Sequence, residues 1–237
     1  MVQYLGSSSY WHETSRHVPG PVLQGHHDLD VAIVGGGFTG LWTALQLRQA
    51  EPSMNVAVIE REVIGFGASG RNGGFAMTLL DMSLAHLRRN HGDAAAKAAH
   101  EAVASSVSEM GEAIDQHGIK CEWRNGGLMV VATNRPQQER IDADLAAAEA
   151  LGLDGFRRLS GDEAQAEVHS PTYVGGLHET HCGVLHPAKL ARGLARVVSR
   201  AGAEVFERSD VTGIDEVTGQ IRITTPRGTV NADQVVL

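Results

Sequence analysis

Near the start of the chain, continuous runs of apolar residues alternate with a segment in which apolar residues recur at helical spacing. The run LDVAIV predicts a buried strand over 29–34, apolar residues at helical spacing predict a helix over 39–49, and NVAVIE predicts the next strand over 55–60. Strand, helix and strand in this order predict a βαβ unit. Residues 1–28 have no sustained period and predict an arm laid over the surface, pinned by Tyr10 and Trp11.

Helical spacing returns in the middle of the chain. Polar and alanine-rich sequence predicts helix from about residue 81 to 117, and GLMVVAT predicts a strand over 127–133. Asn134 and Pro136 are good opening residues, so the next helix is expected to run from there to about residue 151. Another short helix is predicted to start near Ser160.

The last fifty residues predict a helix followed by strands. Pro187 near its start and Gly202 at its end indicate the helix, which leads into a strand over 203–207. Apolar and polar residues then alternate, with turns at 218–219 and 227–228, as in a three-stranded meander. The sequence stops at Leu237 within a predicted strand, so we expect a fragment.

Composition narrows the class of partner. The chain has 237 residues, 42% of them hydrophobic, which is enough to bury a core. A net charge of -8, with Lys and Arg scattered, argues against nucleic acid or an anionic membrane and favours a small molecule. Two distant cysteines predict ordinary buried thiols, and no transmembrane or secretory pattern is visible, so a cytoplasmic protein is expected.

The segment HETHC raises the question of a metal site, because it holds His178, His181 and Cys182 within five residues. Zinc sites of this kind need a fourth ligand and usually a second pair, and no matching pair is visible. We therefore interpret the segment as a polar turn between strands and expect no metal.

A glycine-rich motif joins the first predicted strand to the first predicted helix. Gly35, Gly37 and Gly40 form GxGxxG after a buried strand and at the opening of a helix. In this context the glycines permit a tight turn, the approach of a pyrophosphate to the backbone, and close packing of helix and strand. The helix N-terminus adds free amides and the positive end of a dipole. Glu60, twenty residues beyond Gly40, suits the ribose hydroxyls, so the motif predicts a dinucleotide site.

A second glycine-rich loop bears on the choice between NAD and FAD. Both cofactors use the first motif, but a simple NAD dehydrogenase usually continues directly to a third strand. Here IGFGASGRNGGF intervenes at 64–75, and its five glycines bring more backbone against a flat ligand. FAD is therefore the preferred cofactor, and an NAD-dependent dehydrogenase stays the alternative.

At these residues the chain resembles the D-amino-acid oxidase superfamily of FAD-dependent amine and amino-acid oxidases, especially its gamma-glutamylputrescine oxidase-like branch. The segments DVAIVGGGFTGLWTALQL, VIEREVIGFGASGRNGGF and HPAKLARGLARVVSRAGAEVFERSDVTGI occur in the family's order. The resemblance implies an α/β fold, with a Rossmann-like FAD-binding domain and an inserted, incomplete α+β substrate domain. The expected parts are an arm at 1–28, FAD-binding segments at 29–80 and 181–237, and a helical and mixed insertion at 81–180.

The resemblance also implies which residues hold FAD. The pyrophosphate would be lined by residues of the first loop, and the adenosine ribose held at the end of the second strand. The second loop would approach the ribityl chain and the flavin ring, and one later residue would meet the adenine. In that order these residues are Gly35, Gly37, Thr39 and Gly40; Glu60 and Arg61; Ala68, Ser69, Arg71, Asn72 and Gly73; and Val211.

The implied reaction is oxidation of the C–N bond of an amine or amino acid by hydride transfer to flavin N5. It would give an imine or aldehyde and hydrogen peroxide, with oxygen or a quinone as electron acceptor. No catalytic residue is assigned, although Arg71 is a hypothetical stabiliser of negative charge on the reduced flavin. A truncated chain that performs no reaction stays open as a further alternative.

Overall fold

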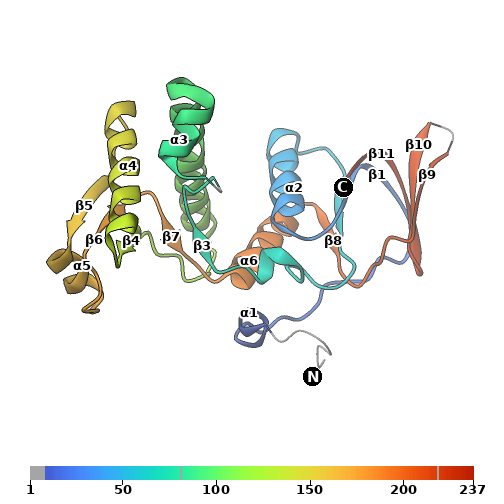
Figure 1. Cartoon of the computed structure of the whole chain (residues 1–237). Coiled ribbons are helices and arrows are strands. Elements are labelled where there is room, and N and C mark those ends of the chain that lie inside the picture. The colour runs from blue at the N-terminus through green and yellow to red at the C-terminus, as the bar shows by residue number, and fades with distance from the viewer. Residues whose placement is uncertain (1–8, 81, 218) are drawn as a thin grey trace. The chain divides into compact units, whose positions relative to one another are not determined.

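The computed structural model describes residues 9–80, 82–217 and 219–237. The chain forms two compact units (Figure 1). Unit 1 comprises Met1–Gly74, His117–Cys121 and His186–Leu237, and unit 2 comprises Phe75–Gln116 and Glu122–Leu185. The chain therefore leaves unit 1, builds unit 2 and returns, and the predicted insertion at 81–180 falls within unit 2 apart from the short segment 117–121.

Unit 1 is built on a six-stranded mixed sheet with the order β8-β2-β1-β11-β10-β9. The strands β8, β2, β1 and β11 are parallel to one another, and β11 also begins an antiparallel meander with β10 and β9. Their bounds are β1 (Gly25–Val34), β2 (Val56–Ile59), β8 (Glu204–Phe206), β9 (Gly213–Val217), β10 (Gln220–Thr224) and β11 (Gly228–Val236). The meander predicted from alternation is confirmed; its turn at 218–219 includes Thr218, which lies outside the described residues.

The βαβ unit predicted at the start of the chain is also confirmed. Helix α2 (Phe38–Ala50) connects β1 to β2, and these strands pair in parallel. The predicted end of the N-terminal arm, at residue 28, is wrong, because β1 begins at Gly25. His26 and His27 continue that strand by pairing with Thr229 and Val230 of β11, a contact between distant parts of the chain that local periodicity does not reveal.

Two helices lie side by side against the parallel strands of unit 1 (Figure 1). Helix α6 (Pro187–Arg200) has Pro187 in its first turn as predicted, and its N-cap is His186, whose Nδ1 accepts from Lys189 N–H. It packs against α2 and β8 and buries most of its length. On the facing strands Ile33, Val56 and Val58 are also buried, so this layer forms an apolar core under the first glycine loop.

The N-terminal segment is tied to the body of unit 1 by polar contacts. Helix α1 (Tyr10–Glu13) places the Trp11 ring edge-on to His186, with centroids 4.9 Å apart. Tyr10 is 67% exposed, so Trp11 rather than Tyr10 is the anchor. Farther along, Arg192 Nη1 donates to both oxygens of Ser15 at 2.6 Å. Residues 10–15 are thus a packed part of the unit.

Unit 2 combines two small antiparallel sheets with helices. The order β4-β6-β5 forms one sheet and β3-β7 the other. The bounds are β3 (Phe75–Ala76), α3 (Leu84–His117), β4 (Leu128–Ala132), α4 (Arg135–Leu151), β5 (Phe156–Ser160), α5 (Gly161–Glu167), β6 (Gly175–Glu179) and β7 (Gly183–Val184). Helix α3 confirms the predicted helical stretch, with a kink at Gly92 (φ 83). The predicted start at residue 81 lies outside the described residues.

Local capping explains why the helices of unit 2 could be predicted closely. The Asn134 side chain accepts from Gln137 N–H at the start of α4, and Gly152 ends that helix in the left-handed conformation. Ser160 and Glu163 form a capping box at α5. By contrast, β5 and β6 were not predicted. His178 and Glu179 belong to β6, so the polar turn expected across HETHC covers only its second half.

Candidate functional site: a glycine turn joined to a second loop

The turn between β1 and α2 brings backbone amides to the start of a helix. Gly35 has φ +112, in the region that favours glycine, and its N–H donates to Ile59 O at 2.9 Å. Gly37 is the N-cap of α2 and has no side chain to cap it. The first N–H groups of the helix have no partner within it, and they lie at the positive end of its dipole. Such a turn suits an anionic group.

Gly40 is where helix and strand meet most closely. A Cβ built on Gly40 would lie 2.2 Å from Gly35 O and 3.1 Å from Ile33 Cγ2. No side chain larger than hydrogen fits there without a shift of the backbone. This close approach is the packing role that the motif predicts for its third glycine.

Glu60 extends from the end of β2 directly to the glycine turn. Its Oε2 accepts from Gly36 N–H at 2.7 Å, and its Oε1 accepts from Glu62 N–H at 2.8 Å. The neighbouring Arg61 is exposed, with its Nε 3.7 Å from Glu62 Oε1. The structure therefore brings Glu60 to the first loop and leaves Arg61 at the surface, while the ribose contacts of both residues stay a prediction.

The second glycine-rich loop is attached to the first by side-chain and backbone hydrogen bonds. Ser69 lies in the short helix η1 (Ala68–Gly70), and its hydroxyl accepts from Phe38 N–H at 2.9 Å. Gly65 N–H donates to Gly36 O at 3.0 Å. Asn72 completes the loop: its Nδ2 donates to Ala68 O and Ser69 O, and its Oδ1 accepts from Gly74 N–H. The two loops form one continuous backbone surface.

Three further predicted residues differ in their surroundings. Arg71 is exposed; its guanidinium lies 4.4 Å from the centre of the Phe66 ring, and its Nε donates to Phe66 O at 2.6 Å. Gly73 is exposed beside it. Val211 is half-buried in the connection between β8 and β9, where it packs against the core cluster that includes Ile59. The contacts of all three with a cofactor stay predictions.

The buried Glu207 is hydrogen-bonded to the start of the second loop, and it was not predicted from the sequence. Its side chain is 2% exposed, and it accepts from Ile64 N–H at 2.6 Å, from His17 Nε2 at 2.7 Å, and from Gly20 N–H. Burial acts to raise the pKa of Glu207, but these hydrogen bonds outweigh it and hold the pKa below the ordinary glutamate value. Glu207 thereby links the N-terminal segment to the second loop. An acid at a strand end is too common a signal to reveal this.

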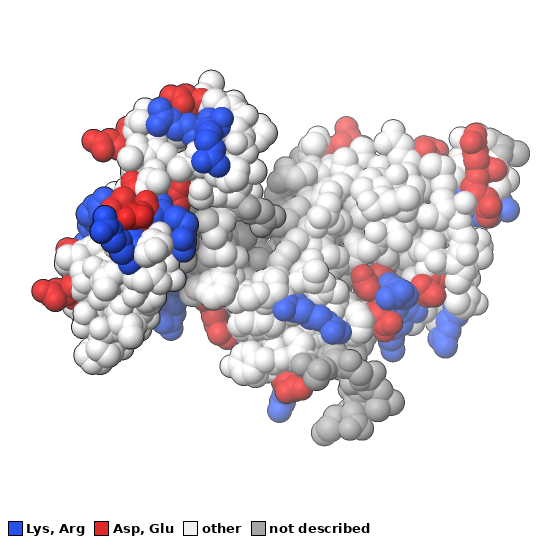
Figure 2. All heavy atoms as spheres, in the orientation of Figure 1, with Lys and Arg blue, Asp and Glu red and all other residues white. Residues whose placement is uncertain are grey.

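Acidic and basic side chains are intermixed on the face shown in Figure 2. Within the described ranges no three His, Cys, Asp or Glu residues are grouped to hold a metal ion. Cys121 and Cys182 are buried free thiols, as predicted, and burial raises the pKa of Cys182. None of the described helices is long and apolar enough to cross a membrane.

A parallel α/β layer with a GxGxxG turn and a carboxylate closing the next strand defines a Rossmann-like dinucleotide-binding fold. Residues 30–237 match the family model of the FAD dependent oxidoreductases (DAO), and the chain belongs to this family. The family is FAD-dependent, which confirms the choice of FAD over NAD made from the second loop.

Two curated relatives match nearly the whole chain. Gamma-glutamylputrescine oxidoreductase of Escherichia coli (strain K12) is 33% identical over 231 residues, which cover 98% of this chain and 53% of that protein. A probable oxidoreductase, OrdL, of Haemophilus influenzae is 29% identical over 217 residues, covering 92% of this chain and 50% of that protein. The chain thus spans about half the length of the curated relatives it matches.

Solved structures agree on the fold. Glycine oxidase from Geobacillus kaustophilus has a TM-score of 0.69 at 24% identity, covering 88% of this chain and 54% of its own. L-Amino acid deaminase from Proteus myxofaciens has a TM-score of 0.73 at 20% identity, and the match covers 93% of this chain and 48% of that protein's chain. At these identities the likeness establishes the α/β fold with its mixed sheet.

Proposed function

We propose that this protein oxidises the C–N bond of an amine or amino acid, with FAD as the hydride acceptor. The observation that carries the proposal is the glycine turn of Gly35, Gly37 and Gly40, joined to Glu60 and to the second loop, in a chain of an FAD-dependent family. The relative at 33% identity bears the name gamma-glutamylputrescine oxidoreductase, which supports an amine as the substrate class.

The residues of the first loop suit the diphosphate of FAD. A Cβ on Gly35 would meet nothing within 4 Å, so the backbone there is open to a ligand. Gly37, Thr39 and Gly40 lie at the first turn of α2, where the positive end of the helix dipole favours an anion. We assign the diphosphate to these four residues.

The remaining residues are assigned to the ribose, the ribityl chain with the flavin, and the adenine. Glu60 already holds two backbone N–H groups, and each of its oxygens keeps a second lone pair that a ribose hydroxyl can use. The second loop is proposed to contact the ribityl chain and the flavin, and Val211 to contact the adenine. The residues proposed there are Arg61 at the ribose, Ala68, Ser69, Arg71, Asn72 and Gly73 at the ribityl chain and flavin, and Val211 at the adenine.

The bound FAD supplies the two-electron acceptor for the oxidation. The protein's part is to hold the cofactor and to orient the substrate. We propose unit 2 as the inserted substrate domain, an imine or aldehyde as the product, and oxygen or a quinone as the final acceptor, with hydrogen peroxide formed in the case of oxygen.

Cofactor retention and a substrate screen test the proposal. The chain is mixed with excess FAD, desalted and examined for the visible absorption of bound flavin; Glu60→Gln should retain less, whereas the exposed neighbour Glu62→Gln should match the wild type. Polyamines, gamma-glutamyl amines and amino acids are then screened for flavin bleaching and peroxide release. A wild-type chain that retains no flavin, or quenching of its tryptophans by a nicotinamide dinucleotide instead, refutes the assignment.

A further inference from the structure

Unit 2 contains an open cavity of about 800 Å³. It lies between the start of α3, helix α4 and the sheet β4-β6-β5. Its walls are mainly aliphatic and aromatic, as is usual for small-molecule pockets. The apolar wall residues include Leu84, Leu128, Ile141, Phe156 and Leu177.

Two carboxylates line this cavity: Asp144, which is half-buried and accepts from Ala85 N–H at 2.9 Å, and Glu179, which is buried. Glu179 is 4% exposed, and its Oε1 accepts from the Thr78 hydroxyl. His100 Nε2 lies 3.8 Å from the same oxygen, which is beyond hydrogen-bond distance. Oε2 accepts no hydrogen bond from any residue within the ranges that the structure describes.

The neighbouring histidine does not neutralise this acid. His100 is 6% exposed and packs on Phe156, with ring centroids 5.2 Å apart. Burial lowers the pKa of His100 below its usual value, so its imidazole is neutral near pH 7. A buried carboxylate without a cation or a full set of donors is unfavourable, and a donor from a ligand would relieve this.

We propose that the cavity binds a small molecule with one ammonium group on an apolar body, and that the ammonium donates to Oε2 of Glu179. The aliphatic and aromatic walls would cover the body. Arg89 and Arg140 also line the cavity, but their side chains are exposed, so solvent and salt screen their charge.

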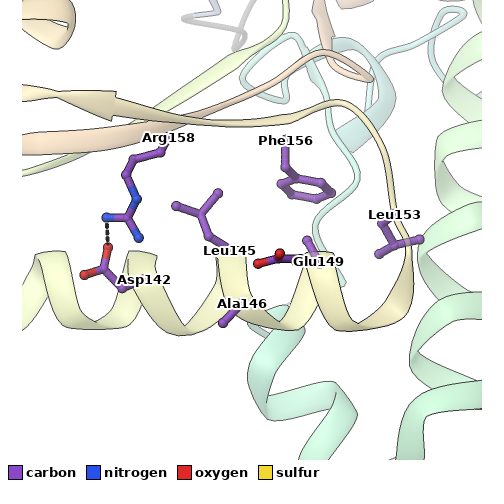
Figure 3. Close-up of a pocket in the computed structure, with 8 residues that line it drawn as sticks. Asp142, Leu145, Ala146, Glu149, Leu153, Phe156 and Arg158 are labelled. Atoms are coloured by element: carbon purple, nitrogen blue, oxygen red, sulfur yellow. Dashed lines mark hydrogen bonds and ion pairs between the residues drawn. The ribbon is translucent and has the colours of Figure 1, made fainter.

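A second hollow in the same unit provides a contrast (Figure 3). It lies over α4 and β5 and measures about 440 Å³. Its Asp142 pairs with Arg158, and Glu149, which also lines it, is exposed. Asp142 therefore has a cation beside it and Glu149 is open to solvent, so neither is a buried acid like Glu179.

The inference adds a binding site within the proposed substrate domain, and the observations that carry it do not depend on FAD. Every residue it uses belongs to unit 2, whereas the residues assigned to FAD belong to unit 1. Flavin retention and amine binding can therefore fail separately, and each is measured by its own assay.

Calorimetric titration with phenethylamine tests the proposal, with phenethyl alcohol as the neutral ligand of the same shape. We expect the wild-type chain to bind the amine, and Glu179→Gln to weaken it by about tenfold or more, because the charged hydrogen bond is lost. Glu149→Gln removes the same charge from the other hollow and should bind like the wild type. The alcohol should bind more weakly than the amine and equally to all three proteins.

Three results would overturn the proposal: no amine binding by the wild type, equal binding by Glu179→Gln, or equal affinity for amine and alcohol. If Glu179→Gln fails to fold, Val130→Trp decides the question, because Val130 lines the cavity and is 38% exposed. A tryptophan there should block the amine, and unchanged affinity in that variant would also refute the site.

Discussion

Replacing Gly40 by alanine should shift the whole glycine turn. The added Cβ would lie 2.2 Å from Gly35 O, more than 1 Å closer than an ordinary contact of about 3.4 Å. Gly35 O belongs to the backbone, and a Cβ is fixed rigidly to its own backbone, so neither atom can rotate away. Helix α2 must move from β1, or the Gly35 turn must open, and either shift disturbs the amides that face the proposed diphosphate.

The size of the effect follows from this geometry. Forcing a methyl group into a packed site costs about 1–3 kcal/mol, and the clash with a backbone oxygen puts Gly40→Ala near the upper end. In a chain of this length each kcal/mol lowers Tm by roughly 2–4 °C. We expect Gly40→Ala to lower the urea midpoint and Tm. Tryptophan fluorescence can monitor this unfolding, since Trp11 and Trp42 both belong to unit 1.

Gly67→Ala is the matched control for this experiment. A Cβ on Gly67 would meet nothing within 4 Å, and its backbone is extended with φ -76. The free energy of unfolding of the cofactor-free chain should change by less than about 0.5 kcal/mol. Equal urea midpoints for Gly40→Ala and Gly67→Ala would refute the packing argument.

Two further substitutions test the supports of the site. Glu207→Gln should lower the free energy of unfolding by about 1.5–3 kcal/mol at pH 7, because charged hydrogen bonds to a buried carboxylate are lost. Since the folded-state pKa of Glu207 is lowered, its contribution is present above the ordinary glutamate pKa and is lost as the pH falls through the folded-state pKa. The gap in urea midpoint between wild type and Glu207→Gln should therefore close in acid, and exposed Glu216→Gln should show no such gap. Ser69→Ala removes the acceptor of Phe38 N–H and should cost about 0.5–1.5 kcal/mol. Ser69→Thr, which keeps a hydroxyl, should recover most of that loss in the same assay.

The parts of the fold that were predicted correctly depend on local signals. Asn134, Pro136 and Gly152 set the ends of α4 through contacts within a few residues. The strand, glycine turn and helix at the start of the chain likewise carry their pattern in one continuous segment. Such signals are readable because neighbouring residues satisfy each other's hydrogen bonds.

The parts that were missed depend on partners far away in the sequence. The first four residues of β1 become a strand only because β11 pairs with them, two hundred residues later. Strand β6 pairs with β4 on one side and with β5 on the other, and it contains two adjacent glycines, which strands seldom favour. Neither case leaves a periodic signal in the strand itself.

The candidate site likewise combines a local motif, which was predicted, with contacts between distant residues, which were not. The motif predicted Gly35, Gly37, Gly40 and Glu60, and the resemblance added Ser69, but neither predicted the hydrogen bonds among them. Glu60 accepts from Gly36 N–H of the first loop, and Ser69 of the second loop accepts from Phe38 N–H. Because the hydrogen bonds lie within the protein, they form without a ligand and fix both loops in advance. A site held in this way loses little conformational entropy on binding, so its affinity for a dinucleotide depends on these supports as well as on the glycines.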